Sequence, residues 1–128
     1  RKVPTILTPH DGEFALLTGS RPGSDRVAAA ERLAESCGCV VLLKGPTTVV
    51  AAPGAPTRLV VNGDQRLATA GTGDVLAGII GALLAKRVGA AEAAAAGAWI
   101  HAESATVAGN AGLVASDLIS AIPAVLER

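Results

Sequence analysis

Four small residues, Ala70, Gly71, Thr72 and Gly73, lead through Asp74 into an apolar helical segment. A loop without bulky side chains lets a phosphate group approach the backbone. The first turn of the following helix presents free N–H groups and the positive end of the helix dipole. These residues therefore predict an anion hole. A plain loop-to-helix turn also explains them, because the spacing matches neither Gly-x-x-x-x-Gly-Lys nor Gly-x-Gly-x-x-Gly.

Asp74 places a carboxylate where the anion is expected to bind. That position is electrostatically unfavourable unless the carboxylate serves as a general base or lies on the metal side of a phosphate. As a base, Asp74 would take the proton from a substrate hydroxyl while the helix terminus stabilises the phosphoryl group under attack. Aspartate is also a common helix N-cap, so the sequence alone leaves both interpretations open.

Lys44 follows five apolar residues and precedes a glycine, so its ammonium group could reach into a cleft from the end of a strand. A point charge there would neutralise phosphate oxygens, although a solvated lysine at a strand end is the alternative. His10 and Glu13 could cap and brace a loop. His101, in an alanine-rich helix, fits a hydrogen-bonded core residue better than a catalyst.

The segments that would position these residues alternate between strand and helix patterns. The β-branched run at 3–8 predicts a strand that leads into a loop at 9–13. Ser24 is a suitable N-cap for an amphipathic helix that ends at Gly38. The continuous apolar run at 39–43 predicts a parallel strand covered on both faces. Both strands would end next to polar residues.

The rest of the chain predicts a hairpin followed by helices. Two β-rich runs at 47–52 and 58–61 flank a Pro-Gly-Ala-Pro turn, which predicts an antiparallel edge to the sheet. Helices are expected to begin near residues 74, 90 and 116, and the second of them to end at Gly109. The first is apolar on all sides and should be buried, and its Gly78 and Gly81 would let another element pass close by. Pro123 would kink or divide the third helix.

Together these elements predict one layered α/β domain. The 128 residues, 50% of them hydrophobic, suit a single domain over residues 1–128 with a real core. Mixed strands and helices with continuous apolar strands predict an αβα arrangement, whose ligands bind beyond the carboxyl ends of strands. The loop at His10, the turn at Lys44 and the glycine loop at Gly71 could all lie at that end.

Composition argues against several functional classes. Basic and acidic residues number 11 each, and one Phe, one Trp and no Tyr provide few stacking surfaces, so nucleic-acid binding is not expected. The longest apolar run, 75–85, is shorter than the roughly 20 residues that span a bilayer. No secretion signal is recognisable, so we expect a cytoplasmic protein. Cys37 and Cys39 fit reduced structural thiols, with no metal site. The absence of Met suggests a piece of a longer chain.

Three ordered segments resemble the ADP/ATP-dependent NAD(P)H-hydrate dehydratase family. They are Thr8-Pro9-His10-Asp11-Gly12-Glu13, Leu43-Lys44-Gly45-Pro46-Thr47-Thr48 and the run from Ala68 to Ile80. The helix containing His101 and the segment Ala115-Ser116-Asp117-Leu118-Ile119 are also similar to that family. The likeness therefore covers nearly the whole chain, and three motifs in order are far more specific than one.

The resemblance implies the C-terminal half of a ribokinase-like αβα domain that dehydrates hydrated NADH and NADPH. It implies ADP or ATP as co-substrate, Mg²⁺ with the nucleotide, and a homo-oligomer, a tetramer in the family. By motif matching, His10 and Asp74 would contact the hydrated dinucleotide, with Asp74 at its hydroxyl. The adenine nucleotide would be held by Lys44, Gly45, Pro46, Thr47, Thr48 and Gly73.

The sequence departs from the family pattern in two places and leaves two other functions open. Asp11 stands where the family usually has Pro, and the stretch 62–68 is shorter than usual. The N-terminal half of the family domain has no counterpart in this sequence, so activity of this piece alone is doubtful. A ribokinase-like kinase acting on a sugar or hydroxymethylpyrimidine would share Gly71 to Asp74. A non-catalytic domain that binds nucleotide or associates with copies of itself is the other alternative.

Overall fold

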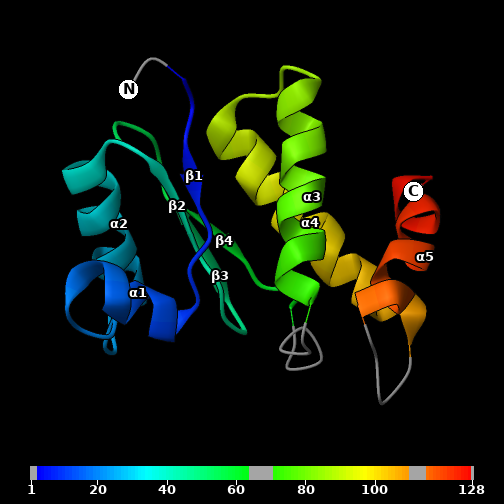
Figure 1. Cartoon of the computed structure of the whole chain (residues 1–128), viewed down its shortest axis with the longest axis horizontal. Helices are drawn as coiled ribbons and strands as arrows, with labels where there is room; N and C mark the ends of the chain where they lie inside the picture. The colour runs from blue at the N-terminus through cyan, green and yellow to red at the C-terminus, as the bar shows by residue number, and fades with distance from the viewer. Residues whose placement is uncertain (1–2, 64–70, 110–114, 128) are drawn as a thin grey trace.

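A four-stranded mixed sheet forms the centre of the computed structural model, which describes residues 3–63, 71–109 and 115–127 (Figure 1). The strands lie in the order β1 (Ile6–Leu7), β2 (Val40–Leu43), β3 (Thr48–Ala51) and β4 (Arg58–Val60). β1 and β2 pair in parallel, whereas β2, β3 and β4 pair antiparallel. The predicted hairpin and its antiparallel edge are therefore confirmed.

Helices cover both faces of this sheet. On one face lie α1 (Asp11–Thr18) and α2 (Arg26–Cys37), and on the other lie α3 (Thr72–Ala85) and α4 (Ala90–Ala108) (Figure 1). The remaining helix, α5 (Ala115–Leu126), packs against α4 at the side away from the sheet. The three-layer αβα arrangement expected from the sequence is confirmed.

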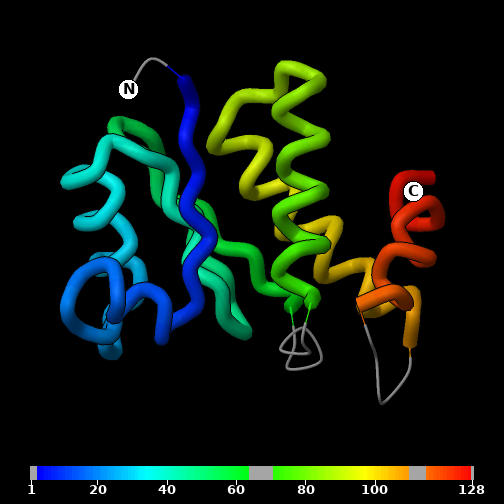
Figure 2. The backbone as a smooth tube through the Cα atoms, in the orientation of Figure 1, coloured from blue at the N-terminus to red at the C-terminus, as the bar shows by residue number. Residues whose placement is uncertain are grey.

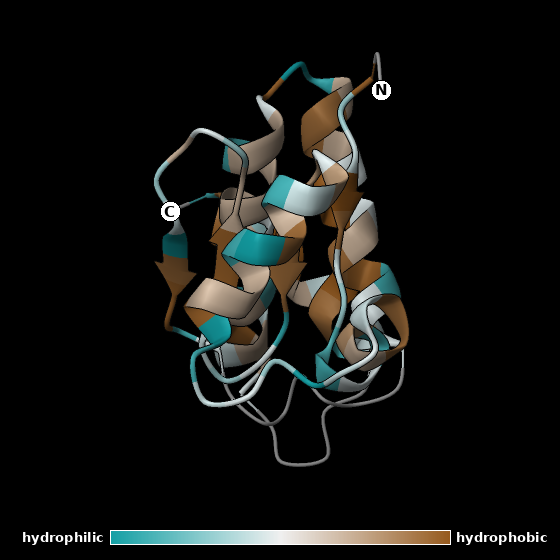
Figure 3. Cartoon of the chain, turned by 90° about the vertical axis from the view of Figure 1, so that its left-hand side faces the viewer, coloured by the Kyte–Doolittle hydropathy of each residue, from teal (hydrophilic) through white to brown (hydrophobic). Residues whose placement is uncertain are grey.

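The core is split by β2, whose side chains alternate between two apolar clusters. Val40 and Leu42 pack with Leu76 and Ile80 of α3 and with alanines of α4, while Val41 and Leu43 pack with Phe14 and the alanines of α2. All four β2 residues are buried. This two-sided burial accounts for the continuous apolar run in the sequence. Coloured by hydropathy, the apolar strands lie behind the mixed surface of α1 and α2 (Figure 3).

Two expected element boundaries are wrong. The loop expected at 9–13 is the beginning of α1, because His10 caps the helix that starts at Asp11. The N-cap of α2 is Asp25, whose carboxylate accepts a hydrogen bond from the Ala28 amide at 3.0 Å, and Ser24 lies one residue outside. At the other end, Gly38 adopts a left-handed conformation with φ +67° and ends α2 as expected.

α3 is not buried on all sides. Leu76 and Ile80 point into the core, whereas Gly78 and Gly81 are exposed, with no described atom within 4 Å of where a Cβ would stand. The close contact expected at these glycines is found instead at Gly97 of α4. A Cβ on Gly97 would lie 2.6 Å from Cγ1 of Ile80. Alanine and glycine thus make the outer side of α3 apolar in composition without burying it.

α4 and α5 follow the expected order, with one correction. α4 ends at a left-handed Gly109, as predicted for the second helix. α5 runs as one helix through Pro123, so of the two expected outcomes, a kink or a division, the division is wrong. Pro123 is exposed, and a proline on the solvent side of a helix removes one hydrogen bond without ending the element. Within the described ranges, no helix combines the length and apolar character needed to cross a bilayer.

Candidate active site

His10 and Glu13 form a reciprocal cap at the start of α1. His10 Nδ1 accepts a hydrogen bond from the Glu13 amide at 3.1 Å, and Glu13 Oε1 accepts one from the His10 amide at 3.1 Å. The backbone hydrogen bond from His10 and the charge of Lys44 lower the pKa of Glu13, which favours its carboxylate form. The expectation that these residues form a cap is confirmed, although they cap a helix and not a loop. The His10 side chain remains 60% exposed, so it can also meet a ligand.

Lys44 reaches from the end of β2 to the beginnings of two helices. Its amide donates to the Pro9 carbonyl at 2.9 Å, which fixes the strand end beside the residues preceding α1. Its Nζ lies 3.7 Å from Oε1 of Glu13 and 3.2 Å from the position that a Cβ on Gly73 would occupy. Gly73 thus leaves space for the ammonium group at the start of α3. The tube drawing places these three segments at one end of the sheet (Figure 2).

The first turn of α3 begins without a side-chain cap. Gly71 is the N-cap, with φ +87°, and no side chain hydrogen-bonds to the cap in the described part of the chain. Asp74 is exposed in that first turn, so its interpretation as the N-cap is wrong. Uncapped amides at a helix start remain available to an anion. Of the predicted anion hole, Gly71, Thr72 and Gly73 are described, and Ala70 lies outside the described residues.

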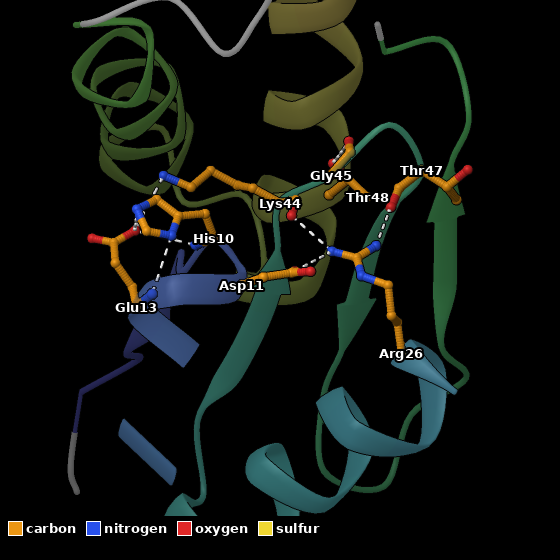
Figure 4. Close-up of polar contacts among 8 residues, drawn as sticks. All are labelled: His10, Asp11, Glu13, Arg26, Lys44, Gly45, Thr47 and Thr48. Carbon is orange, nitrogen blue, oxygen red and sulfur yellow. Dashed lines mark hydrogen bonds and ion pairs between the residues drawn. The ribbon is translucent and has the colours of Figure 1, made fainter. Parts of the chain in front are cut away.

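Arg26 is a site residue that sequence reasoning missed. Its guanidinium donates to the carbonyls of Lys44 and Thr47 at 2.7 and 2.8 Å, and to Oδ1 of Asp11 at 3.0 Å (Figure 4). In the sequence, Arg26 is one of several charged residues in an amphipathic helix. Its partners lie 15 to 21 residues away, so local periodicity gives no signal for them.

Four predicted residues line one cavity of about 500 Å³, next to Arg26. The cavity is lined by His10, Asp11, Gly12, Arg21, Arg26, Lys44, Gly45 and Pro46. Three cationic side chains against one carboxylate favour an anionic ligand. Thr47 and Thr48 follow these residues at the end of the turn and the start of β3, and Thr48 Oγ1 donates to the Gly45 carbonyl at 3.4 Å. A second cavity, of about 620 Å³, lies between β4 and α4 beside Trp99, and no described residue of the predicted site lines it.

His101, in α4, contacts the backbone at the start of α3. Its Nε2 lies 2.9 Å from the Thr72 carbonyl, and because a carbonyl only accepts, Nε2 must carry the proton. His101 is buried, as the sequence suggested. Burial lowers its pKa, and the Thr72 hydrogen bond opposes this effect. A neutral imidazole therefore holds the backbone at the start of α3.

The burial of His101 predicts an acid-sensitive stability. Because its pKa is lower in the folded than in the unfolded protein, the unfolded chain binds this proton first as the pH falls. The free energy of unfolding should then fall below pH about 6.5, with a slope of at most about 1.4 kcal/mol per pH unit. Urea unfolding of His101→Gln at pH 7.5 and 5.5 should show a smaller pH effect than the parent protein. An unchanged pH effect in His101→Gln would contradict the prediction.

The layered α/β arrangement is shared with ribokinase-like domains. A ribokinase-like superfamily protein of Enterococcus faecalis superposes with a TM-score of 0.77 and 24% identity, over 95% of this chain and 44% of that one. That likeness shows the fold. The family is narrower: the model for NAD(P)H-hydrate dehydratase matches residues 1–124, and the chain belongs to this family.

Individual relatives agree with the family. The bifunctional NAD(P)H-hydrate repair enzyme of Mycobacterium leprae is 54% identical over 107 residues, which are 84% of this chain and 23% of that enzyme. The ADP/ATP-dependent NAD(P)H-hydrate dehydratase of Bacillus subtilis, co-crystallised with ATP and Mg²⁺, superposes with a TM-score of 0.93 at 32% identity. That match covers all of this chain and 49% of the B. subtilis chain. The chain thus spans about a quarter of the first relative and half of the second.

Proposed function

We propose that this chain forms the C-terminal, phosphate-handling portion of a dehydratase that restores hydrated NADH and NADPH with ADP. The observation that carries the proposal is the position of the Lys44 ammonium group against Gly73, at a helix start with no side-chain cap. A cation beside a helix start that has no side-chain cap suits a phosphoryl group. Asp74 stands in the same turn, exposed to an incoming substrate.

The proposed reaction removes the hydroxyl group as phosphate. Asp74 takes the proton of the hydroxyl on the hydrated ring, and the resulting oxygen attacks the terminal phosphorus of ADP. The bond to the bridging oxygen breaks and releases AMP. The C–O bond to the new phosphate then breaks, assisted by the lone pair of the ring nitrogen, and loss of a proton from the adjacent carbon restores the reduced nicotinamide. Phosphate is a far better leaving group than hydroxide.

Different residues of the chain bind the nucleotide and the hydrated dinucleotide. The turn formed by Lys44, Gly45, Pro46, Thr47 and Thr48 holds the adenine nucleotide together with Gly73. His10 is exposed at the rim of the adjoining cavity, where it contacts the hydrated dinucleotide. Among the described residues no three His, Cys, Asp or Glu side chains cluster as metal ligands. Mg²⁺ would enter with the nucleotide phosphates and neutralise part of their charge.

The proposal extends to assembly and location. Leu59, Val61 and Trp99 are large exposed apolar side chains at or beside the edge strand β4, a surface that suits contact with copies of the chain, as in a tetramer. Light scattering should show a species larger than the monomer, and a monomer at micromolar concentration would contradict this.

The free thiols Cys37 and Cys39 fit the reducing cytoplasm.

Incubation of the complete protein with hydrated NADH and ADP tests the function. We expect the absorbance of intact NADH to return only when ADP is present, with one AMP and one phosphate formed per NADH. Phosphorylation of hydroxymethylpyrimidine or a sugar, without recovery of NADH, would instead identify a kinase. Binding of ADP with no turnover of any of these substrates would identify a non-catalytic domain.

A further inference from the structure

Arg26 joins three parts of the site that are distant in the sequence. It is the first residue of α2, and its side chain is only 23% exposed. Nη1 donates to the Thr47 carbonyl, and Nη2 donates to both the Lys44 carbonyl and the Asp11 carboxylate (Figure 4). The guanidinium therefore lies across the turn between β2 and β3 and ties it to the start of α1.

The turn itself is shaped to receive the guanidinium group. A Cβ on Gly45 would lie 2.7 Å from Nη2 and 2.8 Å from Nη1 of Arg26, closer than non-bonded atoms approach. Gly45 therefore leaves the space that Arg26 fills. A planar fork can donate to two carbonyls and a carboxylate at once, whereas a lysine ammonium at the same place is a point charge with a different geometry.

We propose that Arg26 is a positioning residue that pre-orders the turn of residues 44–48 for the nucleotide and couples it, through Asp11, to the adjacent substrate-side residue His10. This inference rests on the proposed nucleotide site. The turn carries Lys44, whose side chain extends to Gly73, so a shift of the Lys44 backbone moves the ammonium group away from α3. A turn that is already ordered before binding spends less binding free energy on ordering.

A general effect of positive charge is the competing explanation, and the geometry separates the two. If only the charge of Arg26 mattered, Arg26→Lys would bind ADP like the parent protein. If the planar guanidinium fork matters, Arg26→Lys should bind ADP almost as weakly as Arg26→Gln. Gly45→Ala should weaken ADP binding to a similar degree, although it leaves every charge in place. Combining Arg26→Gln with Gly45→Ala should then cost little more than either substitution alone, because both act on the same contact.

The experiment measures amide hydrogen exchange and ADP affinity in the same variants. The Lys44 amide, which donates to Pro9, should exchange faster in Arg26→Gln, while the amides of β2 keep their protection. The dissociation constant of ADP should rise about tenfold in Arg26→Gln and in Gly45→Ala. Arg32→Gln removes the same charge from an exposed position of α2 and should change neither quantity.

Each outcome decides the proposal. Faster exchange at Lys44 together with weaker ADP binding supports it. The role of the guanidinium fork is overturned if the Lys44 amide exchanges at an unchanged rate in Arg26→Gln. It is also overturned if Arg26→Lys binds ADP as tightly as the parent protein. Faster exchange with unchanged ADP affinity overturns the positioning role alone. A parent protein that does not bind ADP refutes the proposed nucleotide site, and with it the positioning role, while the exchange data still report on the fork.

Discussion

Asp74→Asn should lower the turnover of hydrated NADH by about 10²–10⁴-fold, the range that general bases contribute. Asparagine keeps the size of the side chain but cannot take the proton from the substrate hydroxyl. ADP should bind as tightly or more tightly, because the substitution removes a negative charge from the helix start where the phosphate binds. Turnover assays and calorimetric titration with ADP, on the complete protein, measure the two quantities separately.

A matched control removes a carboxylate from a different helix start, to separate the effect of the position of Asp74 from that of its charge. Glu92→Gln removes a carboxylate from the first turn of α4, where it pairs with Arg58 away from the site. We expect this variant to keep both turnover and ADP affinity. Turnover retained in Asp74→Asn would refute the role of Asp74 as the base.

Lys44→Gln should raise the dissociation constant of ADP by about 10- to 100-fold, corresponding to about 1.4–2.7 kcal/mol. The Lys44 ammonium lies close to Gly73 at the start of α3 and is partly shielded from water, with 27% of its side chain exposed. Glutamine keeps a hydrogen-bond donor but is one bond shorter and carries no charge. Loss of the Lys44 charge should also reduce the salt dependence of ADP binding, which titrations at two ionic strengths would reveal.

Lys86→Gln is the comparison for this substitution, because Lys86 caps the opposite end of the same helix. It should leave ADP affinity unchanged. Equal losses in the two variants would mean that Lys44 acts through the net charge of the protein, and unaltered binding in Lys44→Gln would remove Lys44 from the site.

The parts of the fold that the sequence predicted well are those with a strong local signal. The apolar run at 40–43 reads as a covered strand because both faces of β2 are buried. Gly38 and Gly109 end their helices because each adopts a left-handed conformation that glycine enters without strain. Lys44 and Gly73 could be assigned to one site because both stand at element ends that α/β domains bring together.

The errors have identifiable physical causes. α1 was missed because Pro9 and Gly12 suggest a loop, and the side-chain acceptor of its cap is histidine in place of the usual Ser, Thr, Asp or Asn. Counting apolar residues overstated the burial of α3, since alanine and glycine add little area to bury. Arg26 was missed because its carbonyl partners adopt their positions only after β2 and β3 pair.

Backbone NMR during titration with ADP tests the central claim most directly. The claim is that the amides of Gly73 and Asp74 at the start of α3, together with Lys44, bind the phosphoryl groups. We expect the largest chemical-shift changes at the amides of Gly73, Asp74 and Gly45, with Val61 and Trp99 in the cavity beside β4 unaffected. Changes confined to that second cavity, or no change at Gly73 and Asp74 under saturating ADP, would contradict the account.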